Sequence, residues 1–108
     1  MAKVTINTKA IKNWDTFHAV CKKAFGFPDF YGRNGNAFID CLSDLDSDDG
    51  MTRFVLNLGE SLTVELPGAY EFAERAPEQT VALLAWIGAA NARYVENGKP
   101  PRLVLLPL

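Results

Sequence analysis

Carboxylates are concentrated in one short part of this chain. Five aspartates stand there with no Lys or Arg among them, namely Asp40, Asp44, Asp46, Asp48 and Asp49. Carboxylates at this density can accept charge-assisted hydrogen bonds from a basic partner, or they can hold a divalent cation. Charge runs are also typical of solvated surfaces, so the chemistry depends on which element presents each side chain.

A calcium loop is the first specific interpretation of this run. The segment "DLDSDDG", which starts at Asp44, has the alternating acids of such a loop. An EF-hand loop also requires Gly at its sixth position and Glu at its twelfth. Asp49 and Val55 occupy those positions, so the sequence predicts no EF-hand. We expect no bound metal and no cofactor.

Other catalytic residue types are sparse. His18 is the only histidine, and its place on the flank of a predicted helix favours a structural role over a catalytic one. Cys21 and Cys41 lack metal-ligand spacing, and we expect them to be reduced and buried. The chain has no phosphate-binding glycine loop and no Gly-x-Ser-x-Gly motif. We therefore expect no enzyme; catalysis by the acidic run with a divalent metal stays as an alternative.

The composition indicates a globular protein with a single domain over residues 1–108. The 108 residues are 48% hydrophobic and 22% charged, and the net charge is −2. This slight acidity argues against binding to nucleic acid or to a membrane surface, which requires a basic face. No apolar segment approaches the ~20 residues of a membrane span, and "MAKVTINTKA" lacks the apolar stretch of a signal peptide. We expect a cytoplasmic protein that is a monomer when free.

Hydrophobic periodicity predicts strands that alternate with helices. The predicted strands cover residues 3–7, 51–58 and 102–108. The predicted helices cover residues 13–27, 34–46, 68–75 and 77–98, and residues 59–67 are interpreted as a loop or a short strand extension. Helical crossovers between strands imply an α/β fold, with a small three-stranded parallel sheet flanked by three to four helices.

Several end signals support these elements. Asn13 is a suitable N-cap for the first helix and Gly26 a suitable end. Pro77 suits the first turn of the last helix. The continuous apolar run over residues 102–108 is typical of a strand that is covered on both faces.

The second predicted helix carries the candidate site. Its apolar stripe, which must face the core, consists of Phe38, Cys41, Leu42 and Leu45. The opposite side presents Asn36, Asp40 and Asp44, which are spaced as i, i+4 and i+8. Large hydrophobic groups beside a carboxylate are typical of a protein interface. The predicted partner-binding residues are Phe30, Tyr31, Asn34, Gly35, Asn36, Ile39, Asp40, Ser43 and Asp44.

The segment "FHAVCKKAFGFPDFYGRNGNAFIDCL", residues 17–42, resembles the barstar family of intracellular ribonuclease inhibitors. The most specific part of the resemblance is made by Tyr31, Gly32, Asn34, Ala37, Asp40, Cys41 and Leu42. It implies a parallel α/β domain whose second helix and preceding loop block the active site of a barnase-like ribonuclease. The implied partner is a basic extracellular or toxin ribonuclease, and Asp40 matches the aspartate that enters where substrate phosphate would lie.

Some positions depart from the pattern of that family. They are Phe30, Arg33, Asn36, Ile39 and Arg93, the last near a position where the family carries a carboxylate. The sequence therefore predicts a related but different ribonuclease target, such as a toxin with its own immunity protein. A protein-binding module that keeps the fold but has a non-nuclease partner is the alternative.

Overall fold

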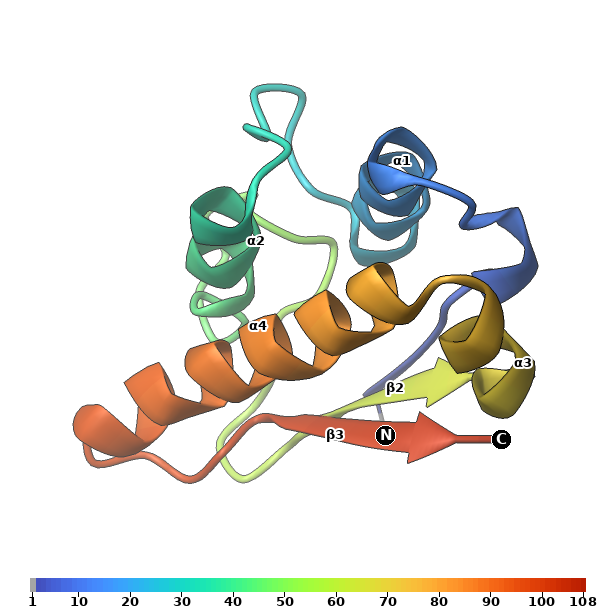
Figure 1. Ribbon diagram of the computed structural model, residues 1–108. Helices are drawn as coiled ribbons and strands as arrows, with labels where there is room; N and C mark the ends of the chain where they lie inside the picture. The colour runs from blue at the N-terminus through green and yellow to red at the C-terminus, as the bar shows by residue number, and fades with distance from the viewer. Residues whose placement is uncertain (1) are drawn as a thin grey trace.

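The computed structural model describes residues 2–108 and contains a three-stranded parallel sheet (Figure 1). The strands stand in the order β1 (Ala2–Thr5), β2 (Leu62–Leu66) and β3 (Leu103–Pro107). The helical elements are the 3-10 turn η1 (Thr8–Ala10), α1 (Trp14–Phe25), α2 (Gly35–Leu42), α3 (Ala69–Arg75) and α4 (Pro77–Glu96). Both neighbouring strand pairs are parallel, so the predicted α/β fold class is confirmed.

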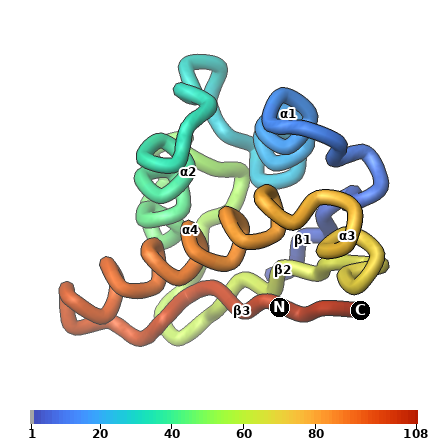
Figure 2. The backbone as a smooth tube through the Cα atoms, viewed as in Figure 1, coloured from blue at the N-terminus to red at the C-terminus, as the bar shows by residue number. Residues whose placement is uncertain are grey.

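The helices cover one face of the sheet. In Figures 1 and 2, α1, α2 and α4 lie on the same side of the strands. Burial along β2 alternates accordingly, with Leu62, Val64 and Leu66 buried toward the helices. On β3, Val104 and Leu106 are exposed. The expectation that this strand is covered on both faces was wrong, because the helices of residues 2–108 pack on one face of the sheet only.

The position of the second strand was also wrong. Residues 51–58 contain no strand, and β2 lies in the stretch that was interpreted as a loop or a short strand extension. The backbone of residues 51–58 is engaged elsewhere, since Arg53 N donates to Phe25 O at 2.9 Å and Leu56 N donates to Leu45 O at 2.6 Å. This segment therefore ties the ends of α1 and α2 together instead of joining the sheet.

Three predicted helix-end signals are confirmed, at Asn13, Gly26 and Pro77. Asn13 caps α1, with its side-chain Oδ1 accepting from Thr16 N at 2.9 Å. Gly26 ends α1 in the left-handed region at φ 70°, and Pro77 is the first residue of α4. Asn13 satisfies a backbone donor and Pro77 lacks one, whereas Gly26 adopts the left-handed conformation without a Cβ clash and donates its N–H to Lys22 O.

Three aromatic rings fix α2 against its neighbours. The Phe38 ring lies 6.0 Å from Phe17 of α1 and 5.4 Å from Trp86 of α4, measured between centroids. Gly35 permits this approach, because a Cβ atom there would come within 2.8 Å of the Trp86 ring. The start of α2 is therefore held by packing from two other helices.

The edge of β3 is protected against pairing with another strand. Asn91 of α4 donates to Leu103 O at 3.0 Å and accepts from Leu103 N at 2.9 Å. Pro107 lies four residues after Leu103, so its backbone faces the same edge of the strand, and it carries no N–H that could pair there. Both features oppose strand addition at this edge.

Candidate protein-binding site

The start of α2 is built by residues that the sequence placed in the site. Asn34 is the N-cap, and its side chain accepts from Ala37 N at 2.8 Å and donates to Gly32 O at 3.1 Å. Gly35 is pressed against Trp86. In the structure, Asn34 and Gly35 therefore set the direction of the helix that presents Asp40.

The end of α2 differs from the prediction. The helix stops at Leu42 and not at residue 46. The buried Tyr94 hydroxyl donates to Leu42 O at 2.6 Å and accepts from Leu45 N at 3.0 Å. The side chain of a residue on α4 thus replaces the backbone partners that would continue the helix. Asp44 lies beyond the helix, so the predicted line through Asn36, Asp40 and Asp44 is wrong at its last member.

Asp40 is exposed, as the periodicity predicts, but it is not alone. Its side chain is 58% exposed, and its Oδ1 accepts from Arg93 Nη1 at 2.5 Å. The Arg93 side chain is 45% exposed, and its Nη1 lies 3.4 Å from Ser43 Oγ. Helical periodicity relates only residues of the same helix, so it could not predict an ion pair between α2 and α4. The departure of Arg93 from the family pattern was the one signal that pointed to it.

The loop before α2 has one exposed and one buried aromatic residue. Phe30 is 77% exposed, whereas only 7% of Tyr31 is accessible. The placement of Tyr31 on the exposed face was therefore wrong. Its hydroxyl lies 2.7 Å from the buried His18 Nδ1, which pins the loop to α1. Burial and the nearby Arg33 lower the pKa of His18, so its ring is neutral and structural, as expected.

The remaining predicted residues lie at different depths. Ile39 is half-buried and packs against the core, because α2 turns that side toward its neighbours. Ser43 is also half-buried, and its hydroxyl donates to Ile39 O at 2.6 Å. The exposed groups that remain form what we call the α2 face, defined as Phe30, Asn36, Asp40 and Arg93.

One aspartate of the acidic run is a structural residue. Asp46 Oδ2 accepts from Lys99 Nζ at 2.7 Å and lies 3.5 Å from Nη2 of the buried Arg102. The hydrogen bond from Lys99 lowers the pKa of Asp46, which keeps the carboxylate ionised. Asp46 therefore anchors the segment after α4 to the start of β3, and its carboxylate is already engaged within the fold.

A second aspartate is electrostatically strained. Burial and a hydrogen bond with the Asp49 carboxyl raise the pKa of Asp44, and the charges of Asp46 and Asp40 act in the same direction. The folded protein thus resists ionisation at this position. A sequence that retains such repulsion at the surface is consistent with a role for the charge outside the fold itself.

Asp44→Asn is expected to raise the melting temperature at pH 7. The gain in unfolding free energy should be less than about 1 kcal/mol, as is typical of a change in surface charge. The folded pKa lies above the unfolded one, so ionisation destabilises the folded state at neutral pH. This penalty disappears as pH falls below the ordinary aspartate range, and the two proteins should then melt alike. Thermal unfolding followed by circular dichroism between pH 3 and 7 measures this; a variant that melts lower at pH 7 contradicts the strain.

The two cysteines have no chemical role at this surface. Both are free and buried. Burial raises the pKa of Cys21 to about 12 and that of Cys41 to about 11, so both remain thiols at neutral pH.

Within residues 2–108, no three side chains of His, Cys, Asp or Glu are gathered where they could bind a metal ion. None of the helices described combines the length and apolar character needed to cross a bilayer.

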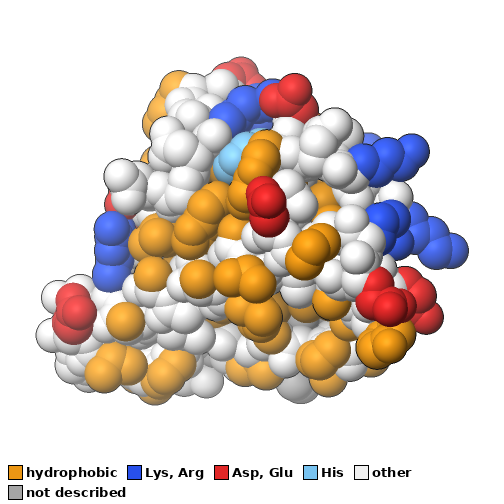
Figure 3. All heavy atoms as spheres, viewed as in Figure 1, with side chains coloured by type: hydrophobic (Ala, Val, Ile, Leu, Met, Phe, Trp, Pro, Cys, Tyr) orange, Lys and Arg blue, Asp and Glu red, His pale blue; other side chains and the backbone are white. Residues whose placement is uncertain are grey.

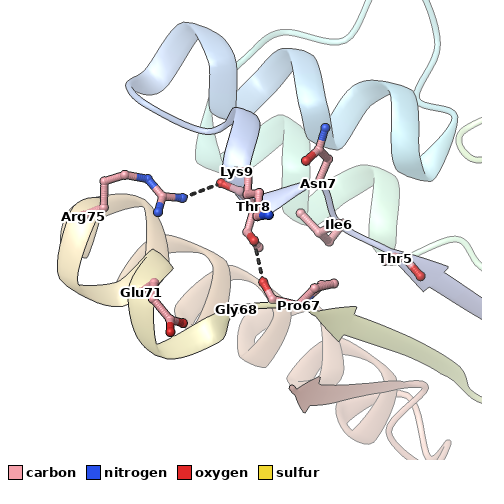
Figure 4. A pocket seen from close by; sticks show the side chains of 9 residues that line it. All are labelled: Thr5, Ile6, Asn7, Thr8, Lys9, Pro67, Gly68, Glu71 and Arg75. Carbon is pink, nitrogen blue, oxygen red and sulfur yellow. Dashed lines mark hydrogen bonds between the residues drawn. The ribbon is translucent and has the colours of Figure 1, made fainter.

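A hollow of about 720 Å³ lies away from the α2 face, beside η1 and the start of α3 (Figure 4). Arg75 Nη2 donates to Thr8 O at 2.8 Å, and Thr8 Oγ1 donates to Pro67 O at 2.5 Å. These polar groups bind one another across the hollow, joining η1 to α3. Their visible role is therefore to close the end of the sheet.

Fold and surface together define a small parallel α/β protein that displays a helix and loop with two opposite charges in contact. The sequence model of the Barstar family, described as barstar (barnase inhibitor), matches residues 1–106. The chain therefore belongs to the Barstar family. Proteins of this family are inhibitors that bind barnase-like ribonucleases, and the family is not one of enzymes. No curated protein matches the chain.

Proposed function

We propose that this protein inhibits a barnase-like ribonuclease by covering its active site with the α2 face, and that Asp40 occupies the position of a substrate phosphate. The observation that carries the proposal is the exposure of the Asp40 carboxylate on a helix whose start and end are both fixed by other elements. A preorganised carboxylate loses little conformational entropy on binding.

The chemistry of ribonucleases supports this role for a carboxylate. An enzyme that cleaves RNA must stabilise a phosphate whose negative charge increases in the transition state, and cationic side chains do this. A carboxylate accepts the same charge-assisted hydrogen bonds, in bidentate form from Arg. It offers no bond for the enzyme to break, so the site stays occupied.

The rest of the acidic run supports fast association. Asp48 and Asp49 are exposed close to α2. Negative charge near a binding surface speeds encounter with a basic protein, and the acceleration falls as salt rises. The charge of Asp44, which the fold itself disfavours, would also speed this encounter.

The test is a titration of the purified chain into two ribonucleases, barnase and a second barnase-like ribonuclease. Cleavage of a fluorogenic RNA oligonucleotide should stop at one equivalent of inhibitor with at least one of the two enzymes. A mononucleotide that fills the phosphate site should compete with the inhibitor. Undiminished cleavage in both titrations, or inhibition that ignores the nucleotide, would show that the proposal is wrong.

A barstar-fold module with a non-nuclease partner is the second candidate. The ion pair between Arg93 and Asp40 favours this second candidate. A purely cationic active site would bind a free carboxylate, whereas the Asp40 carboxylate already has a cation beside it. Affinity capture from the native cell separates the two functions. Recovery of a specific non-nuclease, together with no ribonuclease, supports the module.

A further inference from the structure

We infer that the partner bound at the α2 face presents a carboxylate to Arg93 beside the cation that it presents to Asp40. The two residues would then recognise a cation–carboxylate pair and not a purely basic site. This inference rests on the proposed function and names the kind of ribonuclease site that this chain selects.

Asp40 and Arg93 must be covered together. Their charged atoms are 2.5 Å apart, and each side chain is about half exposed, at 58% and 45%. Because Asp40 Oδ1 and Arg93 Nη1 are in contact, a partner that covers the Asp40 carboxylate also covers Arg93 Nη1. A partner therefore has to satisfy both charges or bear the cost of leaving one unpaired.

The pair retains unused hydrogen-bonding atoms. Among residues 2–108, the Asp40 contacts involve Oδ1, and those of the Arg93 guanidinium involve Nη1. This leaves Asp40 Oδ2 as an acceptor and Arg93 Nη2 and Nε as donors. A cation on the partner fits the acceptor, and a carboxylate fits the planar fork of donors.

The backbone on both sides of the pair is fixed, which favours recognition of both charges. Tyr94 follows Arg93 in the chain and binds the end of α2 through two hydrogen bonds. Ser43 uses its own proton on Ile39 O and so can act as an acceptor toward Arg93. Arg93 therefore projects from a helix that cannot move away from Asp40 without breaking buried contacts.

A ribonuclease site can contain both of the groups that this pair requires. Cleavage of RNA needs cations for the phosphate and a general base for the attacking hydroxyl, and Glu or Asp can serve as that base. A ribonuclease with a carboxylate base thus offers a negative group close to its phosphate-binding cations. Arg93 would bind this catalytic base while Asp40 binds the cations.

The test compares Arg93→Gln with Lys23→Gln, which removes one positive charge from an exposed position on α1. The probe is whichever of the two ribonucleases named above the chain inhibits more tightly. Arg93→Gln is expected to weaken binding about tenfold or more, because a partner carboxylate loses its cation. Lys23→Gln should change binding less than about twofold, as for a rim charge. Thermal unfolding of both variants checks that the fold is retained.

A second arm identifies the partner group. Changing the general-base Glu or Asp of the ribonuclease to its amide should weaken binding of the wild-type inhibitor but not that of Arg93→Gln. Equal weakening of both would show that Arg93 does not contact this base, and the inference would be wrong.

The outcomes separate the inference from the function beneath it. If Arg93→Gln binds as tightly as wild type or more tightly, while Asp40→Ala binds weakly, Arg93 merely competes with the partner; the inference fails and the proposed function stands. If neither ribonuclease is inhibited, or Asp40→Ala has no effect, the proposed function fails and the inference fails with it.

Discussion

Asp40→Ala is expected to weaken binding to the target ribonuclease by at least ~2 kcal/mol, about 30-fold, which is the threshold for an interface hot spot. The carboxylate is exposed, and within residues 2–108 its one partner is the half-exposed Arg93. An exposed ion pair contributes only about 0.2 to 1 kcal/mol to stability. The variant should therefore melt within a few degrees of wild type while its dissociation rate rises. Surface plasmon resonance and thermal unfolding measure the two effects separately.

Glu74→Ala is the matched control for Asp40→Ala. It also removes one exposed carboxylate from a helix, but that helix is α3 and Glu74 lies outside the α2 face. Any loss of long-range attraction between an acidic inhibitor and a basic enzyme is shared by both variants. Only Asp40→Ala should accelerate dissociation. Equal dissociation rates for the two variants would remove Asp40 from the centre of the interface.

The apolar part of the surface outside α2 is broad. Figure 3 shows hydrophobic side chains spread over α4 and β3 on the face viewed there. The exposed residues on these two elements include Val81, Leu84, Val95, Val104 and Leu106. The sequence predicted more cover for β3, because apolar content indicates burial without saying which neighbours exist. A three-stranded sheet with helices on one face leaves such residues in water.

Local sequence signals predicted the start of α1 and of α4. Asn13 and Pro77 act within their own turn, so no distant residue is needed to interpret them. The exposure of Asp40 follows from the same local logic, since Phe38 and Leu42 must face the core. The central residue of the proposed site was thus accessible from the sequence alone.

Tertiary contacts decided the features that the sequence did not reveal. Tyr31 is buried because His18 offers its ring nitrogen, and a polar aromatic residue in a loop gives no sign of such a partner. Residues 51–58 have the composition of a strand, yet their backbone binds the ends of two helices. The contact of Arg93 with Asp40 likewise depends on how α4 crosses α2.

The truncation of α2 at Leu42 is the tertiary effect with the clearest energetic consequence. Two buried backbone groups, Leu42 C=O and Leu45 N–H, depend on the Tyr94 hydroxyl. Burial raises the pKa of Tyr94 to about 12, so the hydroxyl keeps its proton and donates it to Leu42. A buried polar group without a partner costs about 1–3 kcal/mol. Tyr94→Phe is therefore expected to destabilise the protein by about 2–6 kcal/mol, the sum of two such groups.

Tyr70→Phe provides the matched control, because Tyr70 is an exposed tyrosine on α3. Urea unfolding should separate the two variants by the whole predicted difference, and Tyr70→Phe should resemble wild type. If both unfold at the same urea concentration, the hydroxyl does not hold the end of α2. The Tyr94 side chain is buried, so any loss of ribonuclease affinity in Tyr94→Phe acts through the surface groups that it positions, at α2 and the turn that follows it. That loss would show that the inhibitor depends on how rigidly α4 holds α2, and not only on the charge that α2 presents.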